Sequence, residues 1–164
     1  MKPIYLHKEP RIPFTKAGYE KVVEERAKLL AERPDAVDHL HKAREMGDLS
    51  ENGYYKAARA RLSFLDAQLR RAERLIRLGI IVESADRGMV DIGSTVRITD
   101  GANEMEYSIV GGYESDPLKH TISNMSPIGK ALMGKKVNEK IEVNAPAGIK
   151  TFTIVKISAS NPVG

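Results

Sequence analysis

Two acidic residues, Asp48 and Glu51, lie three positions apart in a short polar segment of this chain. At the start of a helix such a pair shares one face, and carboxylate oxygens are the hard ligands that Mg²⁺ takes in proteins. Two acids on an exposed segment would hold the ion poorly without further ligands. The same spacing is also typical of a capping box, in which Asp48 or Ser50 caps the helix and Glu51 reaches back. The four residues alone leave both interpretations open.

The acidic pair connects two long helical patterns. After it, apolar residues recur at alternating spacings of three and four, which predicts a narrow seam against a single partner helix. These residues are Tyr55, Ala58, Leu62, Leu65, Leu69, Ala72 and Ile76. Before it, Thr15 can cap another helix, whose large apolar residues fall at about heptad distances. They are Tyr19, Val23, Leu30, Val37 and Leu40. The connection is so short that the helices must be antiparallel neighbours, with the acidic pair at the tip of the hairpin.

Pro34 lies inside the first of these helical patterns. A proline within a helix removes one backbone hydrogen bond and crowds the preceding turn. We therefore expect a kink or a break near Arg33–Pro34.

The periodicity changes from helix to strand near residue 80, which indicates a domain boundary and predicts domains at 1–82 and 83–164. The expected strands are Ser94–Ile98, Glu106–Val110, Lys140–Asn144 and Thr151–Ile157. Ser126 followed by Pro127 is typical of an N-cap and a first helical residue, and Gly134 would end this short helix. The second domain is thus predicted to be a small antiparallel sheet with one helix packed on it.

The chain has 164 residues, a formal net charge of +4 and no cysteine, which excludes disulfides, cysteine nucleophiles and zinc ribbons. Residues 1–80 hold 17 Lys and Arg against 12 Asp and Glu, whereas residues 81–164 hold 9 against 10, so the positive excess lies in the first half. Much of it belongs to the second helical pattern, at Lys56, Arg59, Arg61, Arg70, Arg71, Arg74 and Arg77. Such a surface fits either a polyanionic neighbour or an ordinary solvated helix face. No segment offers the roughly 20 apolar residues of a membrane helix, and no secretory signal is visible, so a cytoplasmic location without membrane contact is expected.

The tip segment and its continuation, residues 43–59, read A-R-E-M-G-D-L-S-E-N-G-Y-Y-K-A-A-R. This closely resembles the signature A-R-E-x-G-D-L-x-E-N-x-x-Y-x-A-A-[RK] of the GreA/GreB family of bacterial transcript-cleavage factors, and the chain looks closer to GreA. The segments S-P-I-G-K-A-L at 126–132 and A-P-A-G at 145–148 resemble the second domain of the same family. The resemblance covers nearly the whole chain. The fold class that it implies is α+β, with an N-terminal antiparallel α-helical coiled-coil hairpin followed by a small FKBP-like antiparallel sheet domain with one short helix.

The resemblance also implies a function. A family member enters the secondary channel of bacterial RNA polymerase with its coiled coil and stimulates the polymerase's own cleavage of backtracked nascent RNA, which rescues arrested complexes. It is an accessory factor and not an enzyme, and it is expected to be a monomer that holds no cofactor of its own. Asp48 and Glu51 would be the catalytic acids, helping to retain the second, weakly bound Mg²⁺ of the polymerase active site and to position the attacking water.

Further residues match family positions. Arg44 and Arg59 would contact the phosphates of the nascent RNA 3′ segment, although both could instead be surface residues that pair with neighbouring acids. Ser126 and Pro127 would lie in a loop that binds the polymerase. Tyr55 could stack on a base, but its place in the seam favours packing.

Several residues depart from the family pattern or add little to it. Gly53 and Tyr54 stand where family members often have alanine and an acidic residue, and Met125 replaces a polar or acidic residue before the 126–132 segment. The alternative function is therefore a Gre-like regulator that occupies the channel without promoting cleavage. A peptidyl-prolyl isomerase is not expected, because the second half has too few aromatic residues to line its pocket. His39 and His41 have no third ligand nearby in sequence and are interpreted as surface residues.

Overall fold

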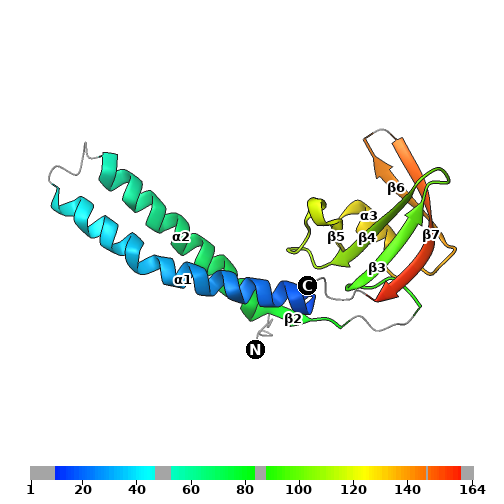
Figure 1. Cartoon of the computed structure of the whole chain (residues 1–164), viewed down its shortest axis with the longest axis horizontal. Helices are drawn as coiled ribbons and strands as arrows, with labels where there is room; N and C mark the ends of the chain where they lie inside the picture. The colour runs from blue at the N-terminus through cyan, green and yellow to red at the C-terminus, as the bar shows by residue number, and fades with distance from the viewer. Residues whose placement is uncertain (1–9, 47–52, 84–87, 147, 160–164) are drawn as a thin grey trace, which may run out of the picture. The chain divides into compact units, whose positions relative to one another are not determined.

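The structure, a computed structural model, describes residues 10–46, 53–83, 88–146 and 148–159. It confirms the predicted fold class, because a long helical hairpin is followed by a curled sheet with a short helix (Figure 1). The chain divides into two compact units: one is Glu20–Leu78, and the other combines the residues up to Tyr19 with those from Gly79 onward. Within the described ranges, no helix is both long and apolar enough to cross a membrane.

The hairpin consists of α1 (Lys16–Glu45) and α2 (Gly53–Leu78). At 1.5 Å per residue, the 30 residues of α1 extend about 45 Å. Polar side-chain pairs connect the two helices. They are Arg26–Glu73, Arg33–Asp66 and His39–Arg61, at 3.5, 2.8 and 3.4 Å between the nearest polar atoms. Since the two residue numbers of each pair add up to 99 or 100, the helices run side by side in opposite directions, as predicted.

The seam of α2 is the predicted one. Its buried or partly buried residues include Tyr55, Ala58, Leu62, Leu65, Leu69, Ala72 and Ile76. Leu65 and Leu69 pack in one apolar cluster with Ala36 of α1. The alternation of spacings three and four therefore identified the face of α2 that contacts its partner.

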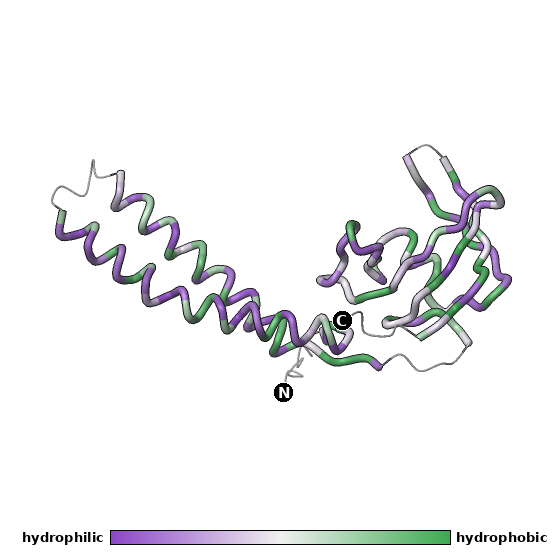
Figure 2. The backbone as a smooth tube through the Cα atoms, in the orientation of Figure 1, coloured by the Kyte–Doolittle hydropathy of each residue, from purple (hydrophilic) through white to green (hydrophobic). Residues whose placement is uncertain are grey.

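The seam of α1 differs from the prediction. Tyr19, Val37 and Leu40 are partly buried, whereas Val23 and Leu30 are 43% and 40% exposed, so the predicted stripe is confirmed only in part. The fully buried residues of α1 are instead Val22, Ala36 and Ala43. Apolar stretches appear at several levels along the tube of α1 (Figure 2).

The face of α1 that contacts α2 carries charged residues as well as apolar ones, so the apolar residues alone did not define it. Arg26 and Arg33 extend along this side of α1, and Glu73 and Asp66 on α2 accept hydrogen bonds from them. Their charges are thus neutralised within the hairpin. Small alanines at the remaining contacts let the helices approach closely.

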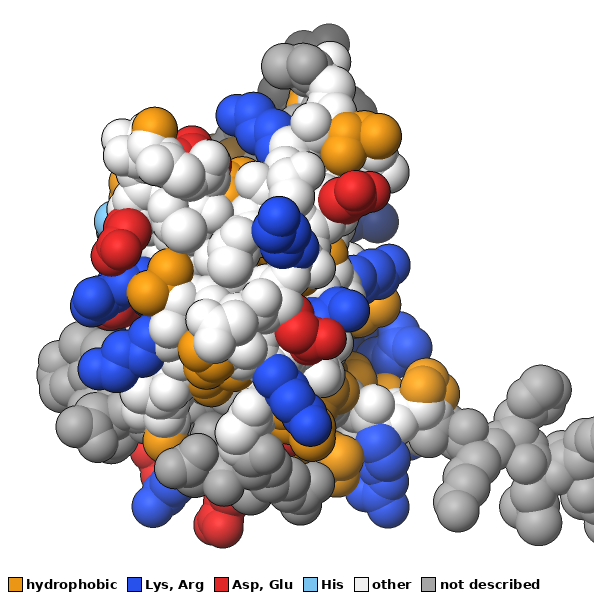
Figure 3. Space-filling model, turned by 90° about the vertical axis from the view of Figure 1, so that its right-hand side faces the viewer, with side chains coloured by type: hydrophobic (Ala, Val, Ile, Leu, Met, Phe, Trp, Pro, Cys, Tyr) orange, Lys and Arg blue, Asp and Glu red, His pale blue; other side chains and the backbone are white. Residues whose placement is uncertain are grey.

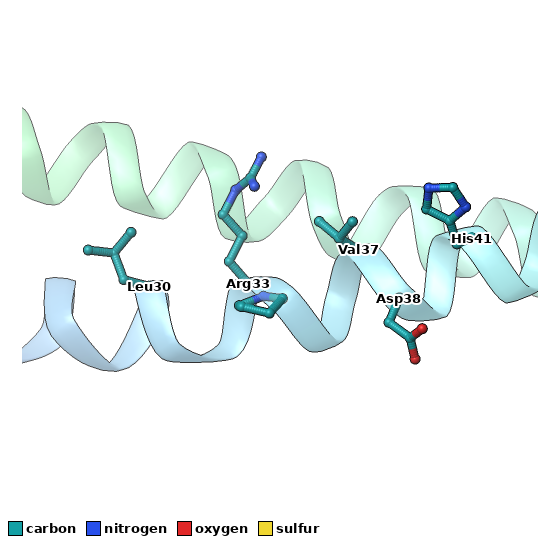
Figure 4. A pocket seen from close by; sticks show the side chains of 6 residues that line it. Leu30, Arg33, Val37, Asp38 and His41 are labelled. Carbon is teal, nitrogen blue, oxygen red and sulfur yellow. The ribbon is translucent and has the colours of Figure 1, made fainter.

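Pro34 does not break α1, so the expected break is absent from the described helix. A proline at this position leaves the carbonyl of Leu30 without its helical N–H partner. Pro34 is exposed, and water can reach this side of the helix. A shallow groove runs along the same side, lined by Leu30, Arg33, Pro34, Val37, Asp38 and His41; in Figure 4, Arg33 points toward the other helix while Asp38 points away.

The second unit contains a five-stranded sheet. Its strands are β3 (Ser94–Thr99), β4 (Glu104–Val110), β5 (Thr121–Ser123), β6 (Lys140–Ala145) and β7 (Gly148–Ala159). They lie in the order β5-β4-β3-β7-β6. All pairs are antiparallel except the short edge pair β4–β5, which is parallel. The four predicted strands are confirmed as β3, β4, β6 and β7.

The helix α3 (Pro127–Leu132) packs on this sheet and completes its core. Buried apolar residues from the strands and from α3 form one cluster: Val90, Val96, Ile98, Ile109, Leu132, Ile141, Phe152 and Ile154. The 3₁₀ turn η1 (Pro117–Lys119) precedes β5. The strands β1 (Ile12–Phe14) and β2 (Gly79–Ile81), which the sequence analysis does not predict, form a separate parallel pair.

Candidate functional site

The acidic pair of the hairpin tip, Asp48 and Glu51, lies outside the described residues. The structure describes the two helix ends that bound this segment, at Glu45 of α1 and Gly53 of α2. The N-terminus of a helix carries a partial positive charge, which favours carboxylates near it. Both the catalytic and the capping interpretation of the pair stay predictions.

Arg44 and Arg59 lie on opposite helices near these ends. Arg44 belongs to the last turn of α1, and Arg59 is the seventh residue of α2. The antiparallel register places Arg59 beside Leu40, so the two arginines are about one helical turn, or roughly 6 Å, apart along the hairpin. Both side chains are exposed, and among the described residues neither has an ion-pair partner.

The neighbouring Lys42 differs from these arginines because it is already paired. Its Nζ lies 2.7 Å from Oδ2 of Asp38, one helical turn earlier. The hydrogen bond between them raises the pKa of Lys42 and lowers the pKa of Asp38. Both groups are exposed to solvent, so this ion pair adds little to the stability of the helix.

Two tyrosines follow the start of α2. Tyr54 is 47% exposed, whereas Tyr55 is partly buried where the seam begins. This agrees with the packing interpretation of Tyr55. Tyr54 presents an aromatic surface close to the tip.

The loop that contains Ser126 and Pro127 is tightly wound. The Ser126 Oγ accepts a hydrogen bond from the Gly129 N–H at 3.0 Å and donates one to the Ser123 carbonyl at 2.8 Å. The Met125 N–H donates to the Ser123 Oγ at 3.0 Å. The predicted cap of α3 by Ser126 is confirmed. The Ser126 hydroxyl is engaged in hydrogen bonds inside the loop, so Ser126 fixes the shape of the loop. The exposed side chains of Met125 and Pro127 form the surface of the loop.

Gly129 is required for this winding. A Cβ added there would lie 2.0 Å from the Ser123 carbonyl oxygen and 3.0 Å from the Ser126 Oγ. Nearby, the side-chain Oδ1 of Asn124 is buried and has no hydrogen-bond partner among the described residues. The loop therefore combines a close backbone approach with an unsatisfied acceptor, directly beside the predicted polymerase-binding residues.

Leu118, which is 92% exposed in η1, is not among the residues predicted from the sequence. Asp116 caps this turn by accepting the Leu118 N–H at 3.0 Å, and Pro117 follows as the first residue. This is the same cap and proline signature as at Ser126, so the sequence did carry a local signal. On the face in Figure 3, apolar side chains are interspersed with basic and acidic ones.

The described residues include no group of three or more His, Cys, Asp or Glu side chains placed to hold a metal ion. His39 contacts Arg61, and His41 lines the groove of α1.

Comparison with known proteins assigns both halves of the chain. Residues 12–78 match a family model described as "Transcription elongation factor, N-terminal", and residues 85–159 match "Transcription elongation factor, GreA/GreB, C-term". A protein named "Transcription elongation factor GreA" from Staphylococcus epidermidis is 40% identical over 147 residues, which are 87% of this chain and 93% of that protein. One of the same name from Novosphingobium aromaticivorans is 42% identical over 150 residues, covering 90% and 95%. The crystal structure of GreA factor homolog 1 of Thermus thermophilus is 25% identical, covers 91% of this chain and 99% of that one, and has a TM-score of 0.44.

Proposed function

Because the chain belongs to the GreA/GreB family of transcription elongation factors, we propose that it enters the secondary channel of bacterial RNA polymerase and stimulates cleavage of backtracked nascent RNA. The observation that carries this proposal is the place of the acidic pair. Asp48 and Glu51 belong to the short segment between the ends of two long antiparallel helices, at Glu45 and Gly53. A narrow hairpin of this length is suited to carrying acids into a channel.

The cleavage itself would take place in the polymerase active site. Asp48 and Glu51 fit Mg²⁺, because the ion prefers carboxylate oxygens. The other ligands would come from the polymerase. When bound, the ion would supply charge neutralisation at the scissile phosphate and a more acidic water. The two acids would help retain it and orient that water.

Two arginines would hold the RNA during this reaction. Arg44 and Arg59 are exposed, lie on opposite helices near the tip and have no ion-pair partner among the described residues. A guanidinium binds a phosphate through two parallel hydrogen bonds, which fixes its position as well as its charge. The pair would thus keep the RNA 3′ segment against the tip.

Docking would use the loop before α3. Ser126 winds this loop through its two hydrogen bonds, and Pro127 begins the helix. Met125, which is 64% exposed, would add an apolar contact at the position where the sequence departs from the family pattern. Polymerase affinity would therefore depend on the loop, whereas cleavage would depend on the tip.

The alternative is a regulator that occupies the channel without promoting cleavage. It is favoured by the start of α2, where Gly53 lowers helix propensity and Tyr54 takes the place of an acid. Measuring cleavage of RNA in a backtracked complex separates the two functions.

The test adds the purified chain to a stalled, backtracked elongation complex and follows shortened RNA that can be extended again. We expect cleavage with the unaltered chain. Since a catalytic metal ion contributes several kcal/mol of transition-state stabilisation, Asp48→Ala or Glu51→Ala should slow cleavage by about a hundredfold. Polymerase affinity should stay nearly the same.

Asp35→Ala, which removes an exposed acid from the middle of α1, is the matched control and should cleave normally. Channel occupancy without any cleavage by the unaltered chain would favour the alternative function. Melting of the hairpin in either tip variant, measured by circular dichroism, would favour the capping interpretation.

A further inference from the structure

The first turn of α1 has an incomplete cap. The Thr15 Oγ1 accepts the Gly18 N–H at 3.0 Å, so Thr15 is the N-cap and Gly18 is the third helical residue. In a complete capping box that third residue is Glu or Gln, whose side chain accepts the backbone N–H of the N-cap. Gly18 has no side chain. The Thr15 N–H therefore needs an acceptor from elsewhere in the chain.

Glu114 supplies this acceptor from a position 99 residues away. Its Oε1 accepts the Thr15 N–H at 3.0 Å and the Gly111 N–H at 3.1 Å. Its Oε2 accepts the Thr15 hydroxyl. Both carboxylate oxygens are thus engaged at the N-terminus of a helix, where a negative charge is favourable and hydrogen bonds to it are strong.

Two glycines make room for this carboxylate. A Cβ at Gly18 would lie 1.8 Å from the Oε2 of Glu114 and 2.1 Å from its Cδ. A Cβ at Gly111 would lie 2.2 Å from the Pro13 carbonyl oxygen and 2.6 Å from the Oε1 of Glu114. The close approach on both sides indicates that the chain is shaped around the Glu114 side chain.

The same place is anchored by aromatic packing. Phe14, which is fully buried, stacks on Tyr113 with ring centroids 6.5 Å apart and meets Tyr19 edge to face at 6.1 Å. Its carbonyl also accepts the Val82 N–H at 2.8 Å, next to the parallel pair β1–β2. Residues from three separate segments therefore converge beside the Glu114 carboxylate.

We propose that Glu114 is a positioning residue for the cleavage reaction, because it completes the cap of α1 and at the same time ties the first turn of that helix to the 111–114 loop. The proposal rests on the proposed function. The helix that starts at this cap continues without interruption to Arg44 in its last turn. A fixed start of α1 would therefore help to define where the tip acids act.

Two variants separate positioning from simple capping. Glu114→Ala removes both the cap and the tie to the loop. Adding Gly18→Glu to it supplies the missing residue of a local capping box, and the new side chain has room because the three closest atoms to its Cβ are all from Glu114. The double variant should restore the cap of α1 but not the tie to Gly111.

Hydrogen exchange of two backbone amides reports these events without polymerase. In Glu114→Ala, the amides of Thr15 and Gly111 should both lose protection. In the double variant only Thr15 should regain it. Unchanged protection of both amides in Glu114→Ala would overturn the proposal, regardless of how this variant affects RNA cleavage by the polymerase.

Cleavage at saturating factor is the second measurement. Glu114→Ala should lower the cleavage rate about tenfold, since small displacements far from the reacting atoms reduce rates strongly. The double variant should stay low, and Glu142→Ala, an exposed acid on β6, should match the unaltered chain. Recovery of cleavage in the double variant would mean that Glu114 only caps the helix, and would overturn positioning.

Glu114→Gln keeps the size of the side chain and one acceptor oxygen, so it serves if Glu114→Ala fails to fold. It should retain part of the protection and part of the cleavage. Full cleavage combined with lost protection at Gly111 would also overturn the proposal. An inactive unaltered chain would instead refute the proposed function, and the exchange measurements would still decide the contacts of Glu114.

Discussion

Replacement of Gly129 by alanine should open the loop that presents Ser126 and Pro127. The added Cβ would lie 2.0 Å from the Ser123 carbonyl oxygen, whereas carbon–oxygen contacts are found at about 3.3 Å or more. The backbone would have to move by roughly 1 Å, because the obstructing atom belongs to the main chain. This movement stretches the hydrogen bonds between Ser126, Gly129 and Ser123.

The expected cost follows from these contacts. Loss of an N-cap costs about 1 kcal/mol, loss of a further hydrogen bond about 1 kcal/mol, and overpacking about 1 to 3 kcal/mol. Because one backbone shift relieves part of all three, we expect Gly129→Ala to lower the free energy of unfolding of the sheet unit by about 3 kcal/mol. A urea titration that follows amide signals of β3 and β7 measures this unit separately from the helices.

Gly112→Ala is the matched control. It adds the same methyl group beside the same loop, but its nearest neighbour is the Met125 sulfur at 3.4 Å, which is an ordinary contact. Its stability should change by less than about 0.5 kcal/mol. Polymerase affinity should fall for Gly129→Ala alone. Equal stability and equal affinity of the two variants would refute the account of how this loop is held.

Three further predictions test other parts of the molecule. Leu65→Ala should destabilise the hairpin by about 3 kcal/mol and Leu30→Ala by less than about 1 kcal/mol, as measured by thermal unfolding, because only Leu65 is buried in the seam. Asp100 accepts two backbone N–H groups of its own turn, which lowers its pKa below the ordinary 3.8. The stabilising contribution of the charged Asp100 carboxylate to the turn is therefore present above pH 3.8 and is lost as the pH falls through the lowered pKa. The amide chemical shifts of the turn should titrate with a midpoint below pH 3.8. The double replacement of Arg44 and Arg59 by alanine should slow cleavage most at low salt. The difference in cleavage rate from the unaltered chain should narrow as the salt concentration rises, because salt weakens phosphate contacts. A difference in rate that does not depend on salt would contradict an RNA contact.

The sequence by itself determined the elements that depend on local patterns. The seam of α2, the strands β3, β4, β6 and β7 and the capped start of α3 at Ser126 all follow from spacing and turn residues. These features need only the nearest neighbours along the chain. The acidic pair and the family resemblance were also legible at this level, since they consist of residue types at fixed separations.

Only the tertiary structure decided which face of α1 packs against α2. Its larger apolar residues predicted a stripe through Val23 and Leu30, yet these two are exposed and the fully buried residues of α1 are Val22, Ala36 and Ala43. Which residues of α1 become buried depends on the partner helix, which also brings Glu73 and Asp66 within hydrogen-bond distance of Arg26 and Arg33. Periodicity in one helix holds no information about the charges that the other helix brings.

Tertiary structure also decided how α1 begins. Thr15 was recognised as a cap, but the acceptor of its N–H comes from Glu114, and nothing in either local sequence points to the other. The Glu114 carboxylate occupies the space that a side chain at position 18 would need. A hydrogen bond between residues so far apart in sequence arises only when the folded chain brings them together, and this is the physical reason why the sequence left it open.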